Sequence, residues 1–558
     1  MAISQETPNG THEPAKAAHV NMMTDTIIAN LPPDGLRSIL RSLLGVDAKV
    51  TPAFQSLAAK YLEATKPTSI PVLFTTRDSK PSLDFYEFQK RYRCLMGCGK
   101  GFESLRAISE VIQQVRKLDI DSTKLDDSSD HTFAVIDSDL VQAVTALQKQ
   151  LSTSSGLRAL SESEQCIIQD LRKANDGCDA NFARSGHSPP FGRGSSTLRT
   201  LLTQDEKKEP NGMNVHRGSR PYQYKSSASN IETMALGEAI VPRMFMGLWQ
   251  FSSPAWGSAS WSNIQKDFRK HADAGFVAYD MADHYGDAER TFGAFRLLQD
   301  DAENIYCATK WCVFETTTIS PGVVKGAITK RLTTLQSNRV ELLQFHWQDY
   351  KDKQYVEAAK LIEQDSRVDG LGLCNFDTDH MDEIIETGVK VVSNQVQFSL
   401  IDLRPTFKMA ESCRKHNVKL LTYGSLCGGL LADRWLGKPA PNLFDPEMTP
   451  SSRKYFEMIT IWGGWKLFQE LLTILSTIGK KHKVSISVVA VRWVLEHEYV
   501  GAVIVGVRMG ISEHVEENLK AFTFKLDEED LGEVQKVLDK SKARDVFEAM
   551  GDCGSEYR

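Results

Sequence analysis

The spacing of hydrophobic residues changes near residue 236. Before that point, apolar side chains recur three and four positions apart, which is typical of amphipathic helices. One stripe follows Asp34, and another follows Pro52, which suits the first turn of a helix. Residues 23–183 are therefore predicted to form a mainly helical domain. The stripes comprise Leu36, Ile39, Leu40, Leu43 and Leu44; Phe54, Leu57, Tyr61 and Leu62; Phe102, Leu105, Ile108, Ile112 and Val115; and Leu140, Val144, Leu147 and Leu151.

Two stretches contain few apolar residues that a hydrophobic core could bury. Residues 1–22 are polar and rich in Pro, Asn and His, and we expect them to be disordered. Residues 184–232 are rich in Gly, Ser, Pro and charge, which predicts a flexible linker. Few contacts should cross such a linker, so the flanking halves are expected to fold independently. The alternative is that the helical domain swings back and packs over the mouth of the second half.

From about Leu236 to Val537, short runs of β-forming residues alternate with amphipathic segments. This alternation predicts parallel strands joined by helical crossovers. Eight strands close a barrel, so residues 233–545 are expected to form an α/β fold, the (β/α)8 TIM barrel, followed by a tail at 546–558. A long segment from Trp435 to Trp465 is expected to cover the substrate side. The strand candidates are MFMGLWQF, FVAYD, NIYCATK, VELLQFH, VDGLGLC, VVSNQVQ, VKLLTYG and GAVIVGV.

The length, net charge and cysteines of the chain exclude some classes of protein. A chain of 558 residues is too long for one hydrophobic core, which favours two domains. The net charge of -6 offers no basic surface for nucleic acid or an anionic membrane. The first residues lack the apolar run of a secretory signal, and the ten cysteines are scattered. We therefore expect a cytoplasmic protein with reduced thiols and no metal site.

One glycine-rich motif lies in the helical domain. The sequence from Gly97 to Gly101 lacks the Ser or Thr of a nucleoside-triphosphate loop and has the wrong glycine spacing. It superficially resembles the glycine turn of S-adenosylmethionine methyltransferases, with Asp137 as a ribose acid. No parallel β/α pattern surrounds it, so a turn before the Phe102 helix is the preferred interpretation.

The ends of the predicted strands are strongly polar. In a (β/α)8 barrel the chemistry lies at the carboxyl ends of the strands. Asp280, Lys310 and His346 stand at three of these ends, and Tyr285 follows the first of them. The further residues at strand ends are Asn375, Gln395, Tyr423 and Arg508.

This set of residues suits the reduction of a carbonyl group by hydride. Such a reaction needs a proton donor for the carbonyl oxygen and polar groups that stabilise the charge developing there. Tyr285 suits the proton donor, and a nearby Lys310 ammonium would favour its phenolate. Asp280 could hold the lysine in place, and His346 could orient the substrate oxygen.

The motifs around these residues resemble the tetrad motifs of the aldo-keto reductase superfamily over residues 233–540. They read DMADHYGDAE from Asp280, TK at Lys310, LQFHW around His346 and LCNF around Asn375. The resemblance implies a catalytic tetrad of Asp280, Tyr285, Lys310 and His346, and NADPH as the cofactor. It implies that Asn375 and Gln395 hold the nicotinamide carboxamide and that Tyr423 stacks on the nicotinamide ring.

The resemblance also marks further cofactor contacts. The stretch from Arg508 to Asn518 is similar to the segment that grips the adenosine phosphate and the adenine, with Arg508 facing a 2′-phosphate. The remaining implied contacts are Gly247, Trp249, Asp280, Cys374, Ser425, Leu426, Gly428, His514 and Glu517.

The sequence departs from the family pattern at four places. Cys374 stands where a serine holds the carboxamide, and Gln348 replaces the usual proline after His-Trp. The segment from Arg508 to Asn518 lacks the usual proline and is longer than the corresponding segment of the family pattern. The region around Phe398 and Ser399 lacks the common tyrosine-histidine-proline pattern. These differences concern the cofactor grip and the substrate, and they leave the predicted fold unchanged.

The leading hypothesis is an NADPH-dependent reductase of a small aldehyde or ketone. The alternative is a cofactor-sensing regulatory barrel whose helical domain binds a protein partner. The four tetrad residues favour the enzyme, because a sensor need not keep all of them.

Overall fold

The computed structural model describes residues 27–28, 31–46, 49–75, 80–118, 120, 127–153, 156–202, 221–225, 230–253, 256–442 and 448–558. The predicted disordered segment, residues 1–22, lies outside this set.

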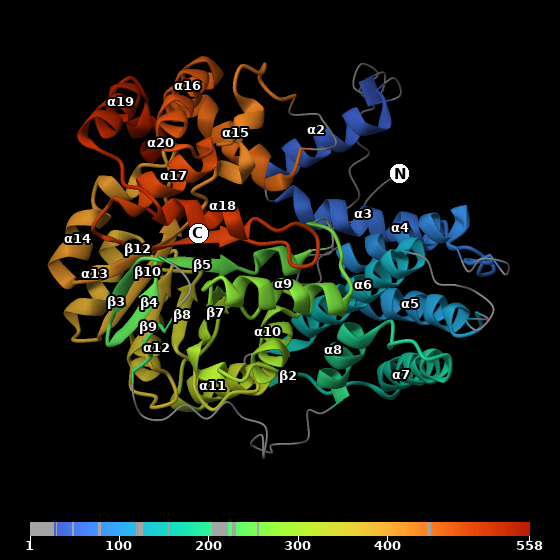
Figure 1. Cartoon of the computed structure of the whole chain (residues 1–558). Helices are drawn as coiled ribbons and strands as arrows, with labels where there is room; N and C mark the ends of the chain where they lie inside the picture. The colour runs from blue at the N-terminus through green and yellow to red at the C-terminus, as the bar shows by residue number, and fades with distance from the viewer. Residues whose placement is uncertain are drawn as a thin grey trace, which may run out of the picture.

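A closed barrel of eight parallel strands forms the second half of the chain, which confirms the predicted (β/α)8 fold (Figure 1). Neighbouring strands follow the order β10-β11-β12-β5-β6-β7-β8-β9. The strands are β5 (Met244–Gly247), β6 (Ala278–Asp280), β7 (Tyr306–Val313), β8 (Leu342–Trp347), β9 (Leu371–Cys374), β10 (Val391–Gln397), β11 (Lys419–Tyr423) and β12 (Val500–Gly506).

Helices surround the barrel and cover the outer faces of its strands (Figure 1). The strands are buried on both sides, which explains their nearly continuous apolar sequences. In β8, for example, every residue is buried. The helices are α9 (Trp261–Asp273), α10 (Ala288–Leu297), α11 (Pro321–Leu335), α12 (Gln354–Glu363), α13 (Thr378–Glu386), α14 (Met409–His416), α15 (Pro450–Trp462), α16 (Gly464–His482), α17 (Ile486–Leu495), α18 (Val515–Leu519), α19 (Glu528–Leu538) and α20 (Ala543–Met550).

One end of the barrel is closed by a hairpin. Strands β3 (Thr233–Leu236) and β4 (Ala239–Pro242) pair antiparallel. Leu236 and Val241 of this hairpin join a buried cluster with the barrel residues Phe245, Ala308 and Leu342. The barrel interior at this end is therefore filled with apolar side chains. The polar side chains lie at the opposite end, where the strands finish.

The first part of the chain is helical, as predicted, and has its own hydrophobic core. The core contains the predicted stripe of Leu105, Ile108 and Ile112. The turn at Gly97–Gly101 connects two helices, and Gly99 adopts a φ of +74°, so the interpretation as a turn is confirmed. The helices are α2 (Pro33–Val46), α3 (Val50–Ala64), α4 (Leu83–Gly97), α5 (Gly101–Val115), α6 (Asp127–Leu151), α7 (Glu162–Arg184) and α8 (Gly192–Leu202), with a short pair β1 (Ser152–Thr153) and β2 (Gly156–Leu157).

The segment predicted as a linker, residues 184–232, differs from that prediction in its described parts. Helix α8 lies within it and packs beside α6. Its sequence has weak helix propensity, but Leu198 and Leu201 are buried, and tertiary packing overrides propensity. Farther along, Tyr222 is buried against the barrel and donates to the carbonyl of Asn304 at 2.7 Å.

The C-terminal residues also differ from their predicted form. The expected tail at 546–558 continues α20 and then folds back over the barrel. The segment from Trp435 to Trp465 is largely helical where described, through α15. Among the helices of the described residues, none has both the length and the apolar character needed to cross a membrane.

Candidate active site

Three of the predicted tetrad residues meet at the carboxyl ends of neighbouring strands. Asp280 ends β6, and Lys310 and His346 lie near the ends of β7 and β8. The Lys310 Nζ donates to Asp280 Oδ2 at 2.7 Å and to the Met281 carbonyl at 2.9 Å. Both side chains of this ion pair are buried. Burial alone would lower the pKa of Lys310, but the charge of Asp280 and the neighbouring Tyr285 raise it, so the ammonium form persists.

A buried amide network fixes the other oxygen of Asp280. The Nε2 atoms of Gln344 and Gln395 donate to Asp280 Oδ1 at 2.8 and 2.7 Å. Gln395 Nε2 also lies 2.7 Å from Gln344 Oε1. Sequence reasoning missed Gln344, although it stands two positions before His346 and so points into the barrel on the same strand face. The network leaves Asp280 few ways to turn away from Lys310.

Tyr285 lies in the turn between β6 and α10, beside the ion pair. The Lys310 Nζ is 4.9 Å from the centroid of the Tyr285 ring. Burial raises the pKa of Tyr285 above its ordinary value, and the Lys310 ammonium opposes that rise without cancelling it. The Lys310 ammonium thus acts in the direction expected from the sequence, and the phenol keeps its proton at neutral pH.

His346 is held at both ring nitrogens. Its Nδ1 lies 3.0 Å from the Cys374 carbonyl oxygen, and its Nε2 lies 3.3 Å from Gln348 Oε1. Both oxygens can only accept, so a neutral imidazole donates to one of them, and the shorter contact favours a proton on Nδ1. Burial lowers the pKa of His346 to about 4, so the imidazole is neutral at pH 7. Gln348, the residue that replaces the usual proline, thus contacts the histidine of the site directly.

The depressed pKa of His346 predicts a pH-dependent stability. The unfolded chain binds a proton at this residue below its ordinary pKa of about 6.5, whereas the folded chain binds it only near pH 4. Stability from this group is therefore present above pH 6.5 and is lost as pH falls toward 4. Between pH 7 and pH 5 the loss should be about 2 kcal/mol, and urea unfolding of His346→Asn should lack it. An equal loss in wild type and variant would contradict the assignment.

The residues expected around a nicotinamide ring also lie at the barrel mouth. The Tyr423 hydroxyl donates to Asn375 Oδ1 at 3.0 Å, and Asn375 adopts a φ of +57°. Cys374 is buried, and burial raises the pKa of its thiol to about 12. The thiol is therefore neutral at pH 7. The Ser425 hydroxyl donates to the Phe398 carbonyl at 3.2 Å, so it is already used within the protein.

The segment expected to grip the adenosine end is built around β12 and α18. Arg508 is exposed, and its Nε donates to Ser512 Oγ at 3.2 Å. The Nδ2 of Asn518 is buried and has no hydrogen-bond partner among the described residues. An orphaned donor of this kind fits a bound purine or sugar acceptor. Glu517 pairs with Lys520 at 2.9 Å, whereas His514, which precedes α18, is exposed.

The remaining predicted cofactor contacts lie at or after the ends of β5 and β11. Gly428, after β11, has a φ of +62°, which L side chains rarely adopt. A Cβ atom there would lie 2.8 Å from the backbone nitrogen of Ser452. The neighbouring Leu426 is half-buried, Gly247 ends β5, and Trp249 follows it with 42% exposure. The orphaned Asn518 donor and the exposed Arg508 are therefore the groups that suit the adenosine end of a nicotinamide dinucleotide.

An open cleft lies where the helical domain meets the barrel. Its wall contains Arg508 and Gln250 of the barrel, and Gln142 and Arg193 of the helical domain. The four tetrad residues do not line it. The cleft is thus separate from the reacting centre and adjoins the predicted adenosine end.

The C-terminal segment closes over the barrel mouth, which the sequence did not reveal. The hydroxyls of Tyr557 and Tyr423 are 2.9 Å apart, and Gln348 Nε2 donates to the Tyr557 carbonyl. Arg558 Nη2 donates to the Trp347 carbonyl at 2.8 Å.

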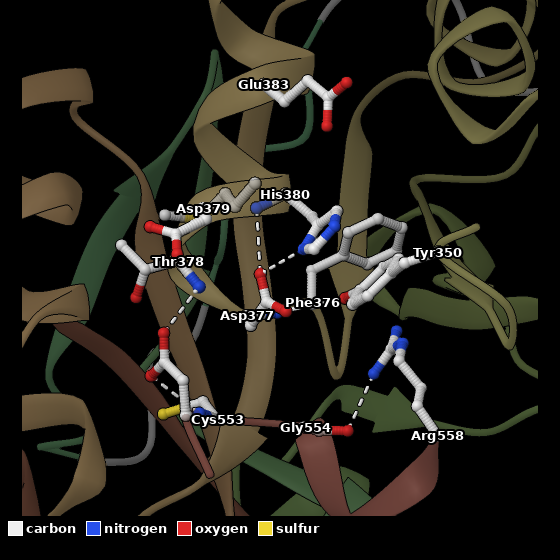
Figure 2. Close-up of polar contacts among 12 residues, drawn as sticks. Tyr350, Phe376, Asp377, Thr378, Asp379, His380, Glu383, Cys553, Gly554 and Arg558 are labelled. Carbon is white, nitrogen blue, oxygen red and sulfur yellow. Dashed lines mark hydrogen bonds and ion pairs between the residues drawn. The ribbon is translucent and has the colours of Figure 1, made fainter. Parts of the chain in front are cut away.

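Tyr350 is stacked between two side chains. Figure 2 shows it between His380 and Arg558. The Arg558 guanidinium lies 3.9 Å from the centroid of the Tyr350 ring.

This segment is anchored by a buried ion pair. Arg404 is fully buried and donates to both carboxylate oxygens of Glu556 at 2.8 Å. Asp402 also accepts from Arg404 at 2.8 and 2.9 Å. The Asp552 carboxylate accepts from the Thr378 backbone nitrogen at 2.9 Å. Tyr557 therefore has a fixed place, with its ring centroid 6.3 Å from that of His346.

Two acidic residues near Tyr285 are bound within the protein. Asp283 pairs with Arg331 of α11 and accepts from the Cys312 backbone nitrogen at 3.2 Å. Glu289 lies in the first turn of α10 and accepts from Thr309 Oγ1 at 2.5 Å.

One trio near the site has metal-binding residue types. Asp283, His284 and Cys312 each offer a ligand atom, and these atoms lie within 4.8 Å of one another. The Arg331 guanidinium already pairs with Asp283, and its charge opposes a cation there. The trio is therefore better described as part of the wall beside Tyr285.

Comparison with known proteins gives a family match. Residues 243–539 match the model of the family described as "Aldo/keto reductase family". The chain is 24% identical over 277 residues to "Aldo-keto reductase str7" of Strobilurus tenacellus, which covers 48% of this chain and 79% of that protein. It is 29% identical over 139 residues to "Flagellar radial spoke protein 5" of Chlamydomonas reinhardtii, which covers 24% of this chain and only 26% of that protein.

Among solved structures, the glycerol dehydrogenase AKR11B4 from Gluconobacter oxydans is 23% identical to the chain. The superposition covers 56% of this chain and 96% of that structure, with a TM-score of 0.45.

Proposed function

The chain belongs to the aldo/keto reductase family, and from this premise we propose that its barrel reduces an aldehyde or ketone to an alcohol with NADPH, with Tyr285 as the proton donor. The observation that carries the proposal is the buried Lys310–Asp280 ion pair lying against the ring of Tyr285. A cation held this close to a neutral phenol favours the phenolate that forms when the proton leaves. The arrangement suits an acid that is stable at rest and assisted during proton transfer.

Each residue has a separate task in this proposal. Tyr285 gives its proton to the carbonyl oxygen, and Lys310 stabilises the charge left on the phenol. Asp280 keeps Lys310 charged and oriented. His346 would orient the substrate, and its neutral state avoids a second buried cation at the carboxyl ends of the strands. Closure by Tyr557 would exclude water from the reacting atoms.

A reduced nicotinamide, when bound, supplies the hydride. Asn375 and Gln395 would hold its carboxamide, and Tyr423 would support its ring. Gln395 already donates to Asp280 and Gln344, so its role would depend on its oxygen or on rearrangement of this network. Asn518 and Arg508 would hold the adenosine end.

Preference for NADPH over NADH should depend on Arg508. A guanidinium can hold a phosphate through two charge-assisted hydrogen bonds. Arg508→Ala should raise the Kd of NADPH by about 10-fold to 100-fold and change that of NADH little, as measured by fluorescence titration. Arg414→Ala, which removes an exposed arginine paired with Glu498, should change neither. Equal affinity of the wild type for both cofactors would overturn this prediction.

The proposed activity is tested by a panel of aldehydes and ketones, with 4-nitrobenzaldehyde as the generic member. The full chain is mixed with NADPH, and the loss of NADPH absorbance is followed. We expect turnover of at least one carbonyl that needs both enzyme and carbonyl. NADPH binding without turnover of any panel member would count against the enzyme.

A second candidate function is a cofactor-sensing barrel whose helical domain binds a protein partner. The observation behind this candidate is the similarity, over 139 residues, to a protein named "Flagellar radial spoke protein 5". The same panel separates the candidates, since a sensor binds NADPH without turnover.

A cytoplasmic location is proposed for either function. It is supported by ten free thiols, which persist in a reducing compartment.

A further inference from the structure

The helical domain contacts two loops at the mouth of the barrel. Gln142 Nε2 of α6 donates to the Phe251 carbonyl at 3.0 Å. Arg193 of α8 donates through Nε and Nη2 to the two carboxylate oxygens of Asp287 at 2.8 and 2.7 Å. The same guanidinium lies 5.3 Å from the centroid of the Phe251 ring. Figure 1 shows α6 and α8 on the side of the helical domain that faces the barrel.

The ion pair between Arg193 and Asp287 is buried, with side-chain exposures of 8% and 1%. Burial alone would raise the pKa of Asp287, but Arg193 outweighs it, so the pKa is lowered and the carboxylate is charged. A bidentate contact of two buried charges fixes both distance and orientation. The contact therefore constrains the loop more tightly than an exposed ion pair would.

Asp287 stands two residues after Tyr285, in the same hydrogen-bonded turn. The Tyr285 nitrogen donates to the Ala282 carbonyl, and the Ala288 nitrogen donates to the Tyr285 carbonyl, both at 3.1 Å. Between them, Gly286 has a φ of +61°. A Cβ atom at Gly286 would lie 2.5 Å from the Phe251 carbonyl oxygen and 3.0 Å from Gln142 Nε2. The helical domain thus packs directly on the turn that carries the phenol.

Arg193 is itself fixed to the helical domain. Asp137 of α6 accepts from the backbone nitrogen of Gly194 at 2.7 Å and from that of Arg193 at 3.4 Å. Arg193 Nη1 lies 3.4 Å from Ser138 Oγ. A continuous set of contacts therefore runs from α6 through the start of α8 to Asp287.

We propose that Arg193 is a positioning residue, through which the helical domain holds the Tyr285 turn in its reactive place. The proposal rests on the proposed function of Tyr285 as proton donor. Arg193 touches no reacting atom and acts through Asp287. A displacement of about 1 Å at a reacting group can cost about 100-fold in rate, so a loosened turn is expected to slow the reaction more than it weakens binding.

The test compares full-length variants at saturating NADPH and carbonyl. Arg193→Ala and Asp287→Asn should each lower kcat by about tenfold or more, with the NADPH Kd and the carbonyl KM within about twofold of wild type. Arg193→Lys keeps the charge but loses the two-point contact, so it should recover part of kcat. The double variant should be no slower than the slower single variant, because both changes break one contact.

Arg296→Ala is the matched control. Arg296 pairs with Glu341 at the other end of α10, with exposures of 1% for both side chains. This variant should lower Tm without lowering kcat at a temperature where the protein is folded. Wild-type kcat in folded Arg193→Ala and Asp287→Asn would overturn the proposal. Asp287→Asn keeps the size of the side chain, so it decides the matter if Arg193→Ala does not fold.

A second readout does not depend on activity. Backbone amides of residues 282–291 should exchange hydrogen faster in Arg193→Ala than in wild type or Arg296→Ala. If the wild type reduces no carbonyl, the proposed function fails, and exchange alone judges whether Arg193 holds the turn. Unchanged exchange at 282–291 in Arg193→Ala and Asp287→Asn would overturn the positioning role even if the enzyme is active.

Discussion

Replacing Tyr285 by Phe is expected to lower turnover by about 100-fold or more, while the fold and NADPH binding stay as in wild type. The substitution removes only the hydroxyl, so the ring remains against Lys310, whose Nζ is 4.9 Å from the ring centroid. The phenol is the proton donor of the proposed reaction, and a benzene ring cannot replace it. Steady-state kinetics and a fluorescence titration with NADPH measure the two parts of the prediction.

Tyr279→Phe is the control for the loss of a phenolic hydroxyl. Tyr279 lies on β6, and its hydroxyl donates to the Phe268 carbonyl at 3.3 Å, within the packing between barrel and helices. This variant should keep wild-type turnover. Wild-type turnover in Tyr285→Phe would remove Tyr285 from the mechanism.

Replacing Lys310 by Met is expected to abolish turnover and to lower the free energy of unfolding by about 3–5 kcal/mol. The change leaves the Asp280 carboxylate buried without its cation, although Gln344 and Gln395 still donate to it. It also removes the charge that stabilises a phenolate at Tyr285. Urea unfolding at pH 7 measures the stability, and the carbonyl panel measures the activity.

The double variant Lys310→Met/Asp280→Asn separates the two effects. Removing both charges should restore much of the stability, because no unpaired ion remains buried. Turnover should stay absent, since the cation beside Tyr285 is still missing. Recovery of turnover in the double variant would contradict the role given to Lys310.

The sequence predicted the barrel well because its elements follow local rules. The strands are largely buried on both faces, as VELLQFH is, and amphipathic helices lie between them, and this pattern is visible in a single sequence. The meeting of Asp280, Lys310 and His346 follows from the barrel itself, since parallel strands end at one rim. Gln344 could have been found by the same alternation along β8.

The sequence could not reveal contacts between residues far apart in the chain. Helix α8 has a Gly- and Ser-rich sequence, and it is stabilised by burial of Leu198 and Leu201 against α6. The pairs Arg193–Asp287 and Arg404–Glu556 join charged residues that look like surface positions on their own. Their burial depends on the docking of the helical domain and of the C-terminal segment, which no periodicity records.

The predicted independence of the two halves has to be reconsidered for the same reason. The contacts from Gln142 and Arg193 favour the alternative, in which the helical domain packs over the barrel mouth. A barrel without residues 1–202 would leave Asp287 without its partner. We therefore expect such a barrel to be slower than the full chain.

The central claim is that this chain transfers hydride to a carbonyl carbon. It is tested most directly by incubating the full chain with an aldehyde and NADPH that carries deuterium on both positions of the nicotinamide C4. Mass spectrometry of the products should find an alcohol with one deuterium on the former carbonyl carbon, formed in wild type and nearly absent in Tyr285→Phe. Binding of NADPH without deuterated alcohol from any aldehyde or ketone of the panel would contradict the account.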